Sequence, residues 1–187
     1  PKFAANLNFL FQDIDFFERF AAAAENGFQA VEYLFPYEYP PDQLKQALAT
    51  HDLVQALFNL PPGDWNAGER GLAALPGRET EFRAAVNLAG KYAEALACKQ
   101  VHVMAGIVPE GAQRDAYEEC YIANLSYAAD YFAARGVRTL IEPLNSFDMP
   151  GYLLNGSKQA RRVIEAVGSD NLYLQYDVYH LQIMEGN

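Results

Sequence analysis

Two acidic side chains stand in apolar segments and are the first candidates for chemistry. Glu142 lies within TLIEPLN (residues 139–145), and Asp177 lies within LYLQYDV (residues 172–178). A buried carboxylate that stays charged is costly, so such groups are usually protonated, paired or bound to a metal. Two neighbouring carboxylates repel each other unless a proton or cation lies between them. Their oxygens suit Mg2+ or Mn2+, and the alternative is a buried ion pair of each with Arg or Lys.

Two histidines are candidates for contacts near these carboxylates. His180 follows Asp177 by three residues, just beyond the same segment. This position favours contact with a bound substrate, and a nearby imidazole would widen the choice of metal toward transition metals. His102 lies between two valines. That pattern fits a substrate-binding residue and a hydrogen-bonded core residue equally well.

A long loop supplies the third kind of candidate. Residues 61–77 are rich in Gly and Pro and contain the only tryptophan of the sequence, Trp65. Long loops in compact domains often act as lids or binding loops, and a guanidinium suits a carboxylate. Arg70 is therefore a candidate for binding an acidic substrate. A solvated loop, with Trp65 packed on the rim of the fold, is an equally good interpretation.

These candidates must be positioned by elements that alternate along the chain. Six apolar, β-rich stretches are the predicted strands: residues 3–10, 30–35, 53–60, 100–106, 139–145 and 172–178. Helical periodicity marks residues 14–27, 40–51, 78–97, 116–136 and 157–168, and a sixth helix is expected to start around Leu181. Strands that alternate with helices predict a parallel sheet with right-handed crossovers. Side-chain alternation brings Glu142 and Asp177 together if both face the interior of a barrel.

Two architectures accommodate this order. A doubly wound open sheet suits the length but usually has a glycine-rich phosphate turn after its first strand, and none follows residues 3–10. A (β/α)8 barrel places its active site at the carboxyl ends of its strands and typically needs about 250 residues. About six of its βα units would be present. A helix end, a glycine and a strand with a glutamate recur at residues 25–35 and 134–144, which fits a repeated βα unit.

Composition narrows the function classes. The 187 residues suit one α/β domain over residues 1–187, and the 51% hydrophobic content excludes a disordered chain. A net charge of -10 disfavours nucleic acid and anionic membranes as partners. Cys98 and Cys120 lack metal-type spacing and are expected to be reduced. The sequence shows neither a secretory signal pattern nor a membrane-length apolar run, so a cytoplasmic location is expected.

Several stretches together resemble the hydroxypyruvate isomerase family, within the xylose-isomerase-like barrel superfamily. They are FAANLNFLF, GFQAVEYLFPY, LFNLPPGDWNAGERGLAALPGRE, LIEPLN and QYDVYH. The resemblance implies a TIM barrel whose divalent metal is held by a Glu on strand five and an Asp on strand six. Glu142 and Asp177 match these positions, and His180 matches a substrate-contacting histidine. The family's remaining ligands, on strands seven and eight, have no counterpart before Asn187, so the last quarter of the barrel is expected to be lacking.

The resemblance also implies a reaction. Hydroxypyruvate and tartronate semialdehyde would interconvert by metal-assisted proton transfer through an enediol. Glu142 would serve as a ligand and as one acid/base, and the family's second acid/base is a Glu on strand eight. The alternatives are a ketose 3-epimerase or sugar isomerase of the same superfamily, or a non-catalytic, truncated binder of sugar acids. An abasic-site nuclease is disfavoured by the acidic charge and by the presence of only three histidines.

Overall fold

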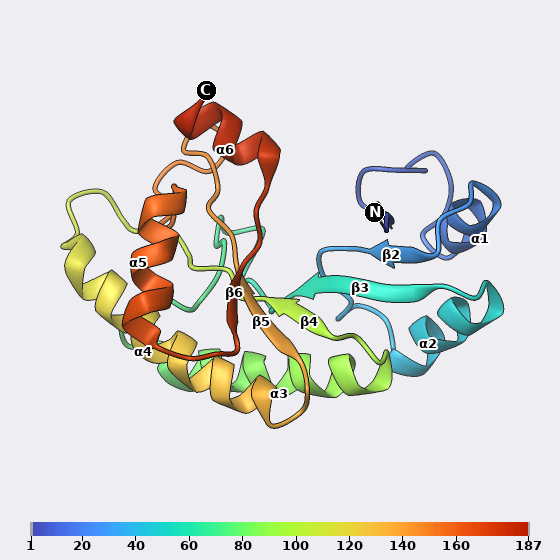
Figure 1. Cartoon of the computed structure of the whole chain (residues 1–187), viewed down its shortest axis with the longest axis horizontal. Coiled ribbons are helices and arrows are strands. Elements are labelled where there is room, and N and C mark those ends of the chain that lie inside the picture. The colour runs from blue at the N-terminus through green and yellow to red at the C-terminus, as the bar shows by residue number, and fades with distance from the viewer. Residues whose placement is uncertain (1, 187) are drawn as a thin grey trace.

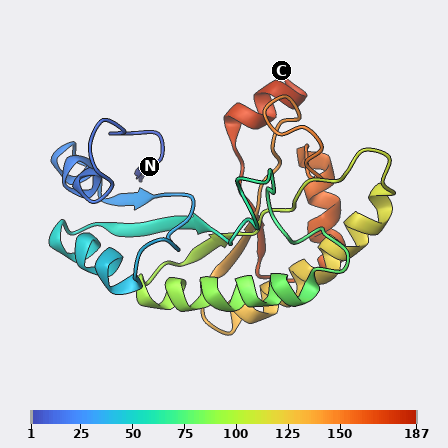
Figure 2. The ribbon, with the colours of Figure 1, turned by 180° about the vertical axis from the view of Figure 1, so that it is seen from behind.

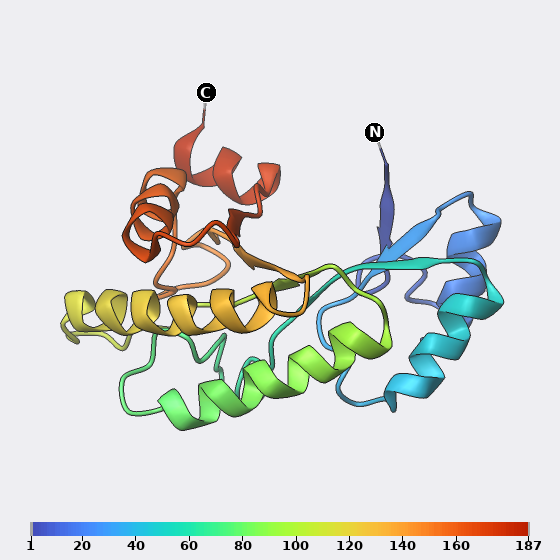
Figure 3. The same ribbon diagram turned by 60° about the horizontal axis from the view of Figure 1, so that its bottom comes forward.

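The structure, a computed structural model, describes residues 2–186. Within this range six strands form one sheet in the order β1-β2-β3-β4-β5-β6, and every neighbouring pair is parallel (Figure 1). The strands are β1 (Ala4–Asn6), β2 (Ala30–Glu32), β3 (Val54–Asn59), β4 (Gln100–His102), β5 (Arg138–Ile141) and β6 (Leu172–Leu174). The sheet is curved, with β1 and β6 at its edges (Figure 3). The predicted alternation of six βα units is confirmed.

A helix follows each strand in the described part of the chain. The helices are α1 (Glu18–Glu25), α2 (Pro41–Thr50), α3 (Glu79–Ala95), α4 (Arg114–Ala133), α5 (Ser157–Val167) and α6 (Val178–Glu185). Helices α3, α4 and α5 pack in sequence along the sheet, while α6 lies beyond the carboxyl end of β6 (Figure 1). Their apolar sides bury large residues such as Phe20, Phe82 and Phe132 against the sheet. Removing this apolar surface from water is the main stabilising contribution to the fold.

The strands are shorter than the sequence predicted. Each was expected to run on to the following polar residues, but β5 ends at Ile141 and β6 ends at Leu174. Glu142 therefore comes directly after a strand instead of lying within it, and Asp177 lies three residues beyond one. Both carboxylates sit at the carboxyl edge of the parallel sheet, where functional groups of barrels of this kind gather.

The start of the last helix corrects the sequence prediction. Helix α6 begins at Val178, whereas a start around Leu181 was expected. The reason is a side-chain cap: the Asp177 carboxylate accepts hydrogen bonds from the backbone N–H groups of Tyr179 at 2.7 Å and His180 at 3.2 Å. Such a cap satisfies amides that otherwise lack partners at a helix N-terminus. Asp177 therefore has a structural task in addition to any chemical one.

The loop between β3 and α3 is anchored to the sheet. Leu72, Ala73 and Ala74 are buried, and the backbone N–H of Ala74 donates to the carbonyl of Ala105 at 2.8 Å. Gly71 approaches the backbone of Met104 so closely that a Cβ would overlap it. Figure 2 shows this loop, in teal to green, passing in front of the place where the strands converge. Residues 71–74 of the loop are thus packed against the sheet, whereas residues 64 and 66–68 are exposed.

Cys98 and Cys120 are both free thiols. Between residues 2 and 186, no helix combines the length and the apolar character needed to cross a membrane.

Candidate active site

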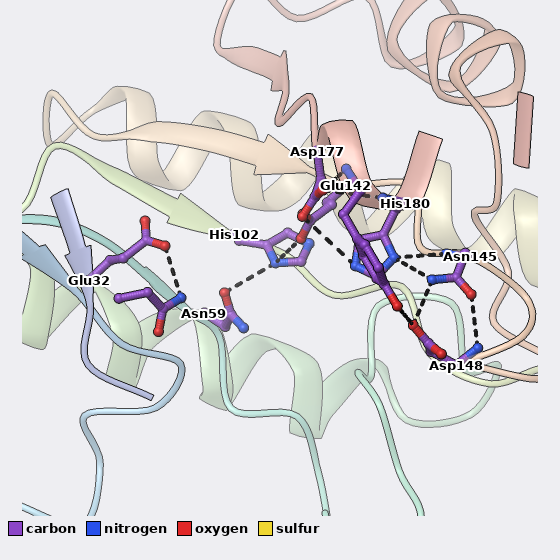
Figure 4. A network of polar contacts seen from close by, with 10 residues as sticks. Glu32, Asn59, His102, Glu142, Asn145, Asp148, Asp177 and His180 are labelled. Carbon is purple, nitrogen blue, oxygen red and sulfur yellow. Dashed lines mark hydrogen bonds and ion pairs between the residues drawn. The ribbon is translucent and has the colours of Figure 1, made fainter. Parts of the chain in front are cut away.

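Three side chains converge beyond the ends of β5 and β6. Glu142, Asp177 and His180 each offer one ligand atom, and these atoms lie within 4.8 Å of one another (Figure 4). Glu142 is 7% exposed, while Asp177 and His180 are half-buried. The structure thus brings together the two carboxylates and the histidine that the sequence singled out. Helix α6 is responsible for this arrangement, because Asp177 caps its N-terminus and His180 lies in its first turn.

Glu142 is held in surroundings that disfavour its charge. Burial, reinforced by the charge of Asp177, raises the pKa of the Glu142 carboxyl to about 8. Neither carboxylate has a Lys or Arg partner in the described part of the chain. Their nearest ion-pair contacts are with histidines: His102 lies 3.7 Å from Glu142, and His180 lies 3.9 Å from Asp177. The alternative of a buried ion pair with Arg or Lys is therefore not realised among these residues.

His102 is buried next to Glu142. Its side chain is almost completely buried, and Nδ1 lies 3.1 Å from Oδ1 of Asn59. Burial lowers the pKa of His102 to about 3, so the ring is neutral at physiological pH. Nε2 is also buried and has no hydrogen-bond partner among the described residues. His102 combines the features of both sequence interpretations, since it is a buried, hydrogen-bonded residue that borders the site.

His180 is anchored on the opposite side of its ring from the carboxylates. Nδ1 of His180 lies 3.2 Å from the backbone N of Asn145 and 2.8 Å from its side-chain Nδ2. Asn145 is fully buried and follows Glu142 by three residues. The two sequence segments that supply the carboxylates are therefore joined by a hydrogen-bonded bridge.

Glu32 was not among the site residues predicted from the sequence. Its Oε1 accepts a hydrogen bond from Nδ2 of Asn6 at 2.9 Å, and the two residues are paired in register between β1 and β2. Burial raises the pKa of Glu32, the bond from Asn6 opposes this shift, and the charge of Asp177 adds to it. Figure 4 shows Glu32 at the same edge of the sheet, toward β1 and β2. The recurring glycine–strand–glutamate pattern was the sequence signal that could have identified it.

Arg70 is ordered within its own loop. Its guanidinium lies 3.8 Å from the centroid of the Trp65 ring, and NH1 donates to the carbonyls of Trp65 at 3.0 Å and Glu69 at 2.7 Å. Trp65 in turn packs edge-on against Phe35. Among the described residues, no hydrogen bond or ion pair joins Arg70 to Glu142, Asp177 or His180. The structure thus fixes the orientation of the guanidinium without linking it to the carboxylates.

The donor set fits a divalent metal ion. Two carboxylates face each other without a cationic side chain between them in the described part of the chain, and the pKa of Glu142 is raised partly by the charge of Asp177. A bound cation would relieve this repulsion, and oxygen ligands of this kind suit hard divalent ions. The arrangement can therefore hold a cation and can also place a carboxylate beside a bound substrate for proton transfer.

Comparisons with known proteins agree with this architecture. The family model described as "Xylose isomerase-like TIM barrel" matches residues 20–187. The chain is 50% identical over 187 residues to the 2-oxo-tetronate isomerase of Cupriavidus necator, covering 100% of this chain and 72% of that protein. It is 47% identical over 185 residues to the hydroxypyruvate isomerase of Escherichia coli K12, covering 99% and 72% of the two chains.

Solved structures show the same fold. A crystal structure described as "AP endonuclease, family 2 from Brucella melitensis" matches with a TM-score of 0.98 and 50% identity, over 100% of this chain and 72% of that one. The D-psicose 3-epimerase of Clostridium cellulolyticum H10 matches with a TM-score of 0.81 and 17% identity, over 100% and 67%. At that identity the second likeness concerns the fold alone.

Proposed function

This chain belongs to the hydroxypyruvate isomerase and 2-oxo-tetronate isomerase family of xylose isomerase-like TIM barrels, and from this membership we propose that it interconverts hydroxypyruvate and tartronate semialdehyde. The observation that carries the proposal is the buried Glu142 carboxyl beside Asp177, at the carboxyl edge of the sheet. A slightly longer 2-oxo acid with a hydroxyl on C3, such as 2-oxo-tetronate, presents the same reacting atoms.

Glu142 is placed to move the proton. In hydroxypyruvate the C3 hydrogens are acidic because C3 is bonded to the C2 carbonyl carbon. Glu142 removes one of them, the electron pair forms the C2–C3 double bond of an enediol, and the C2 oxygen gains a proton. Delivery of a proton to C2 and loss of the C3 hydroxyl proton then give the aldehyde. A carboxyl whose pKa burial moves toward neutrality can both accept and return a proton.

A divalent metal would be held by Glu142 and Asp177. When bound, Mg2+ or Mn2+ supplies polarisation of the substrate's carbonyl and hydroxyl oxygens. The charge of such a cation also opposes the effect of burial on the pKa of Glu142, which favours the ionised base. The neutral ring of His102 lies beside Glu142, and the ring of His180 lies within the group formed by Glu142 and Asp177. The family resemblance also implies a second acid/base, a glutamate of strand eight, that could deliver the proton to C2.

Two other functions are less well supported. A ketose 3-epimerase would use the same carboxylates, but the epimerase likeness rests on 17% identity and therefore on fold alone. One similar structure bears the name of an AP endonuclease, yet the present sequence has a net charge of -10 and three histidines. Such a charge repels a phosphate backbone, and so few histidines do not favour a multi-zinc site.

The test is isomerisation by the full-length polypeptide after chelation and after addition of Mg2+ or Mn2+. We expect metal-dependent conversion of hydroxypyruvate, with 2-oxo-tetronate and a neutral ketose as comparison substrates. Glu142→Gln should lower kcat by about 10²–10⁴-fold, the usual contribution of a positioned acid/base. Glu119→Gln, an exposed position on α4, is the matched control and should keep full activity. An unchanged rate in Glu142→Gln would show that the proposed base is wrong, and conversion of the ketose alone would favour the epimerase.

A further inference from the structure

Nδ1 of His180 is engaged in hydrogen bonds with Asn145. The backbone N–H of Asn145 and its side-chain Nδ2–H both point at Nδ1 of His180, at 3.2 Å and 2.8 Å. A backbone N–H can only donate, so Nδ1 must offer its lone pair. A neutral imidazole carries a single N–H, and in this ring the hydrogen therefore lies on Nε2.

The orientation of the Asn145 amide is itself fixed. Its Oδ1 accepts from the backbone N–H groups of Phe147 at 3.1 Å and Asp148 at 2.9 Å. If the amide oxygen and nitrogen of Asn145 were exchanged, its NH2 group would face these two backbone N–H groups, donor against donor. Nδ2 must therefore face His180. The same Nδ2 also donates to Asp148 at 2.9 Å, and the Tyr179 hydroxyl donates to the same Asp148 oxygen at 2.7 Å. Asp148 thus links Asn145, which follows β5, to helix α6, which carries His180 (Figure 4).

The other ring nitrogen faces the carboxylates. Nε2 of His180 lies 3.9 Å from Oδ2 of Asp177, inside the group formed with Glu142. A ring nitrogen that carries hydrogen has no lone pair for a metal, but it can donate to an oxygen atom. In this tautomer His180 is suited to an oxygen of a substrate held at the carboxylates and is unsuited to ligating the cation.

We propose that Asn145 is a positioning residue that holds His180 in its Nε2–H tautomer and thereby makes it a hydrogen-bond donor to the substrate instead of a metal ligand. The role toward substrate rests on the proposed function, whereas the tautomer and the exclusion from the metal do not. The three can therefore be tested separately in one set of variants.

The tautomer is read by NMR of the full-length polypeptide with nitrogen-15-labelled histidine, at alkaline pH where imidazole is neutral. The signal lost in His180→Gln identifies the residue. We expect wild-type His180 to show a protonated Nε2 and an unprotonated Nδ1. Asn145→Asp retains an oxygen for the Phe147 and Asp148 amides but replaces the Nδ2–H donor with a carboxylate oxygen beside Nδ1. The backbone N–H of residue 145 still donates to Nδ1, so the fraction of the Nδ1–H tautomer should rise without becoming complete. Asn87→Asp, which adds the same charge at an exposed position on α3, should leave the ring unchanged.

Kinetics and metal binding complete the test. Asn145→Asp should lower kcat by about 10–100-fold, as is usual for residues that orient a functional group. His180→Gln, whose amide N–H can replace Nε2–H, should retain more activity than His180→Ala. Mn2+ affinity, measured by electron paramagnetic resonance, should change by less than about threefold in His180→Gln, whereas loss of a ligand would weaken it by about tenfold or more.

Two outcomes would overturn the inference: a protonated Nδ1 in the wild-type protein, or a large loss of Mn2+ affinity in His180→Gln. An unchanged tautomer in folded Asn145→Asp would assign the tautomer to the backbone N–H of residue 145 and overturn the role of the Asn145 side chain. The wild-type spectrum and the His180→Gln titration decide the matter even if Asn145→Asp does not fold. If the wild-type protein turns over none of the sugar acids, the proposed function fails, while the spectra and the Mn2+ titration still test the tautomer and the metal.

Discussion

Oε2 of Glu142 lies 3.7 Å from Nδ1 of His102, and both side chains are buried. This is the distance of an ion pair, yet burial moves both groups toward their neutral forms. The pKa of His102 falls to about 3 and that of Glu142 rises to about 8. Around neutral pH and without a metal, the contact therefore joins a neutral imidazole to a largely protonated carboxyl. Within residues 2–186, no Lys or Arg forms an ion pair with Glu142 that would neutralise its ionised form.

In metal-free protein, the burial of Glu142 should make stability depend on pH. Its pKa is about 8 in the folded protein, against 4.5 when exposed to solvent. The folded state thus keeps a proton that the unfolded chain releases. This stabilisation is fully present below about pH 4.5 and is lost as the pH rises to about 8, by an amount on the order of a few kcal/mol. Urea denaturation of the chelated protein across this range measures the loss.

The matched variants for this experiment are Glu142→Gln and Glu119→Gln. The first should flatten the pH dependence, because a neutral amide has no proton to release, and the second should leave it intact. Mg2+ should raise the unfolding free energy more at the alkaline end, where it does not compete with the proton on Glu142. The same pH dependence in wild type and Glu142→Gln would assign the effect to another group.

Asp177 should show two separable functions. Its carboxylate caps α6 through the amides of Tyr179 and His180, and it also faces Glu142. Asn is as good an N-cap as Asp, so Asp177→Asn should keep the melting temperature while Mn2+ binding weakens by about tenfold or more. Asp177→Ala should lose the metal and an additional amount of about 1 kcal/mol from the cap. Unaltered Mn2+ affinity in Asp177→Asn would remove this residue from the metal site.

The order of elements could be read from the sequence because it follows from local patterns. Alternating apolar periodicities predicted six βα units, and Gly168 ends α5 in the left-handed conformation expected of a helix-terminating glycine. Strand ends were predicted less well, because apolar residues continue past the last ladder hydrogen bond of β5 and β6. The start of α6 was misplaced for a related reason. The start of α6 is set by the side-chain cap of Asp177, which the apolar periodicity around Leu181 does not indicate.

Strand alternation predicted that Glu142 and Asp177 meet although they are distant in sequence, whereas the contact of Glu32 with Asn6 and that of Asn145 with His180 were not predicted. Asp177 and His180 are three positions apart at the start of one helix. Glu32 and Asn6 are 26 positions apart, and only the parallel register of β1 with β2 brings them together. Asn145 and His180 are 35 positions apart and meet because β5 and β6 are neighbours. The partner of each residue in these contacts is set by strand pairing, which the neighbouring sequence does not specify.

Arg70 remains our proposed partner for the substrate's carboxylate. Its stacking on Trp65 and its bonds to backbone carbonyls hold the guanidinium without neutralising it. Arg70→Ala should therefore raise the KM for hydroxypyruvate by about tenfold or more, the usual cost of losing a hydrogen bond to a charged group, and should affect a neutral ketose little. Arg83→Ala removes an arginine that also lies over an aromatic ring, Tyr127, but on the outer helices. It is the control, and equal effects of Arg70→Ala on both substrates would contradict the assignment.

The packing of residues 71–74 against the sheet should depend on a single close contact, that of Gly71 with Met104. Gly71 and Gly68 both have a positive φ, +124° and +93°, so alanine strains the backbone at either position by about 1 kcal/mol. At Gly68 a Cβ would meet nothing within 4 Å, whereas at Gly71 it would overlap the backbone of Met104. Gly71→Ala should therefore cost about 2–4 kcal/mol in urea denaturation, and Gly68→Ala only the strain. Because Met104 follows His102 by two residues, Gly71→Ala should also lower kcat/KM and change the fluorescence of Trp65. Equal losses of stability in the two variants would mean that the loop is free to move away from the sheet.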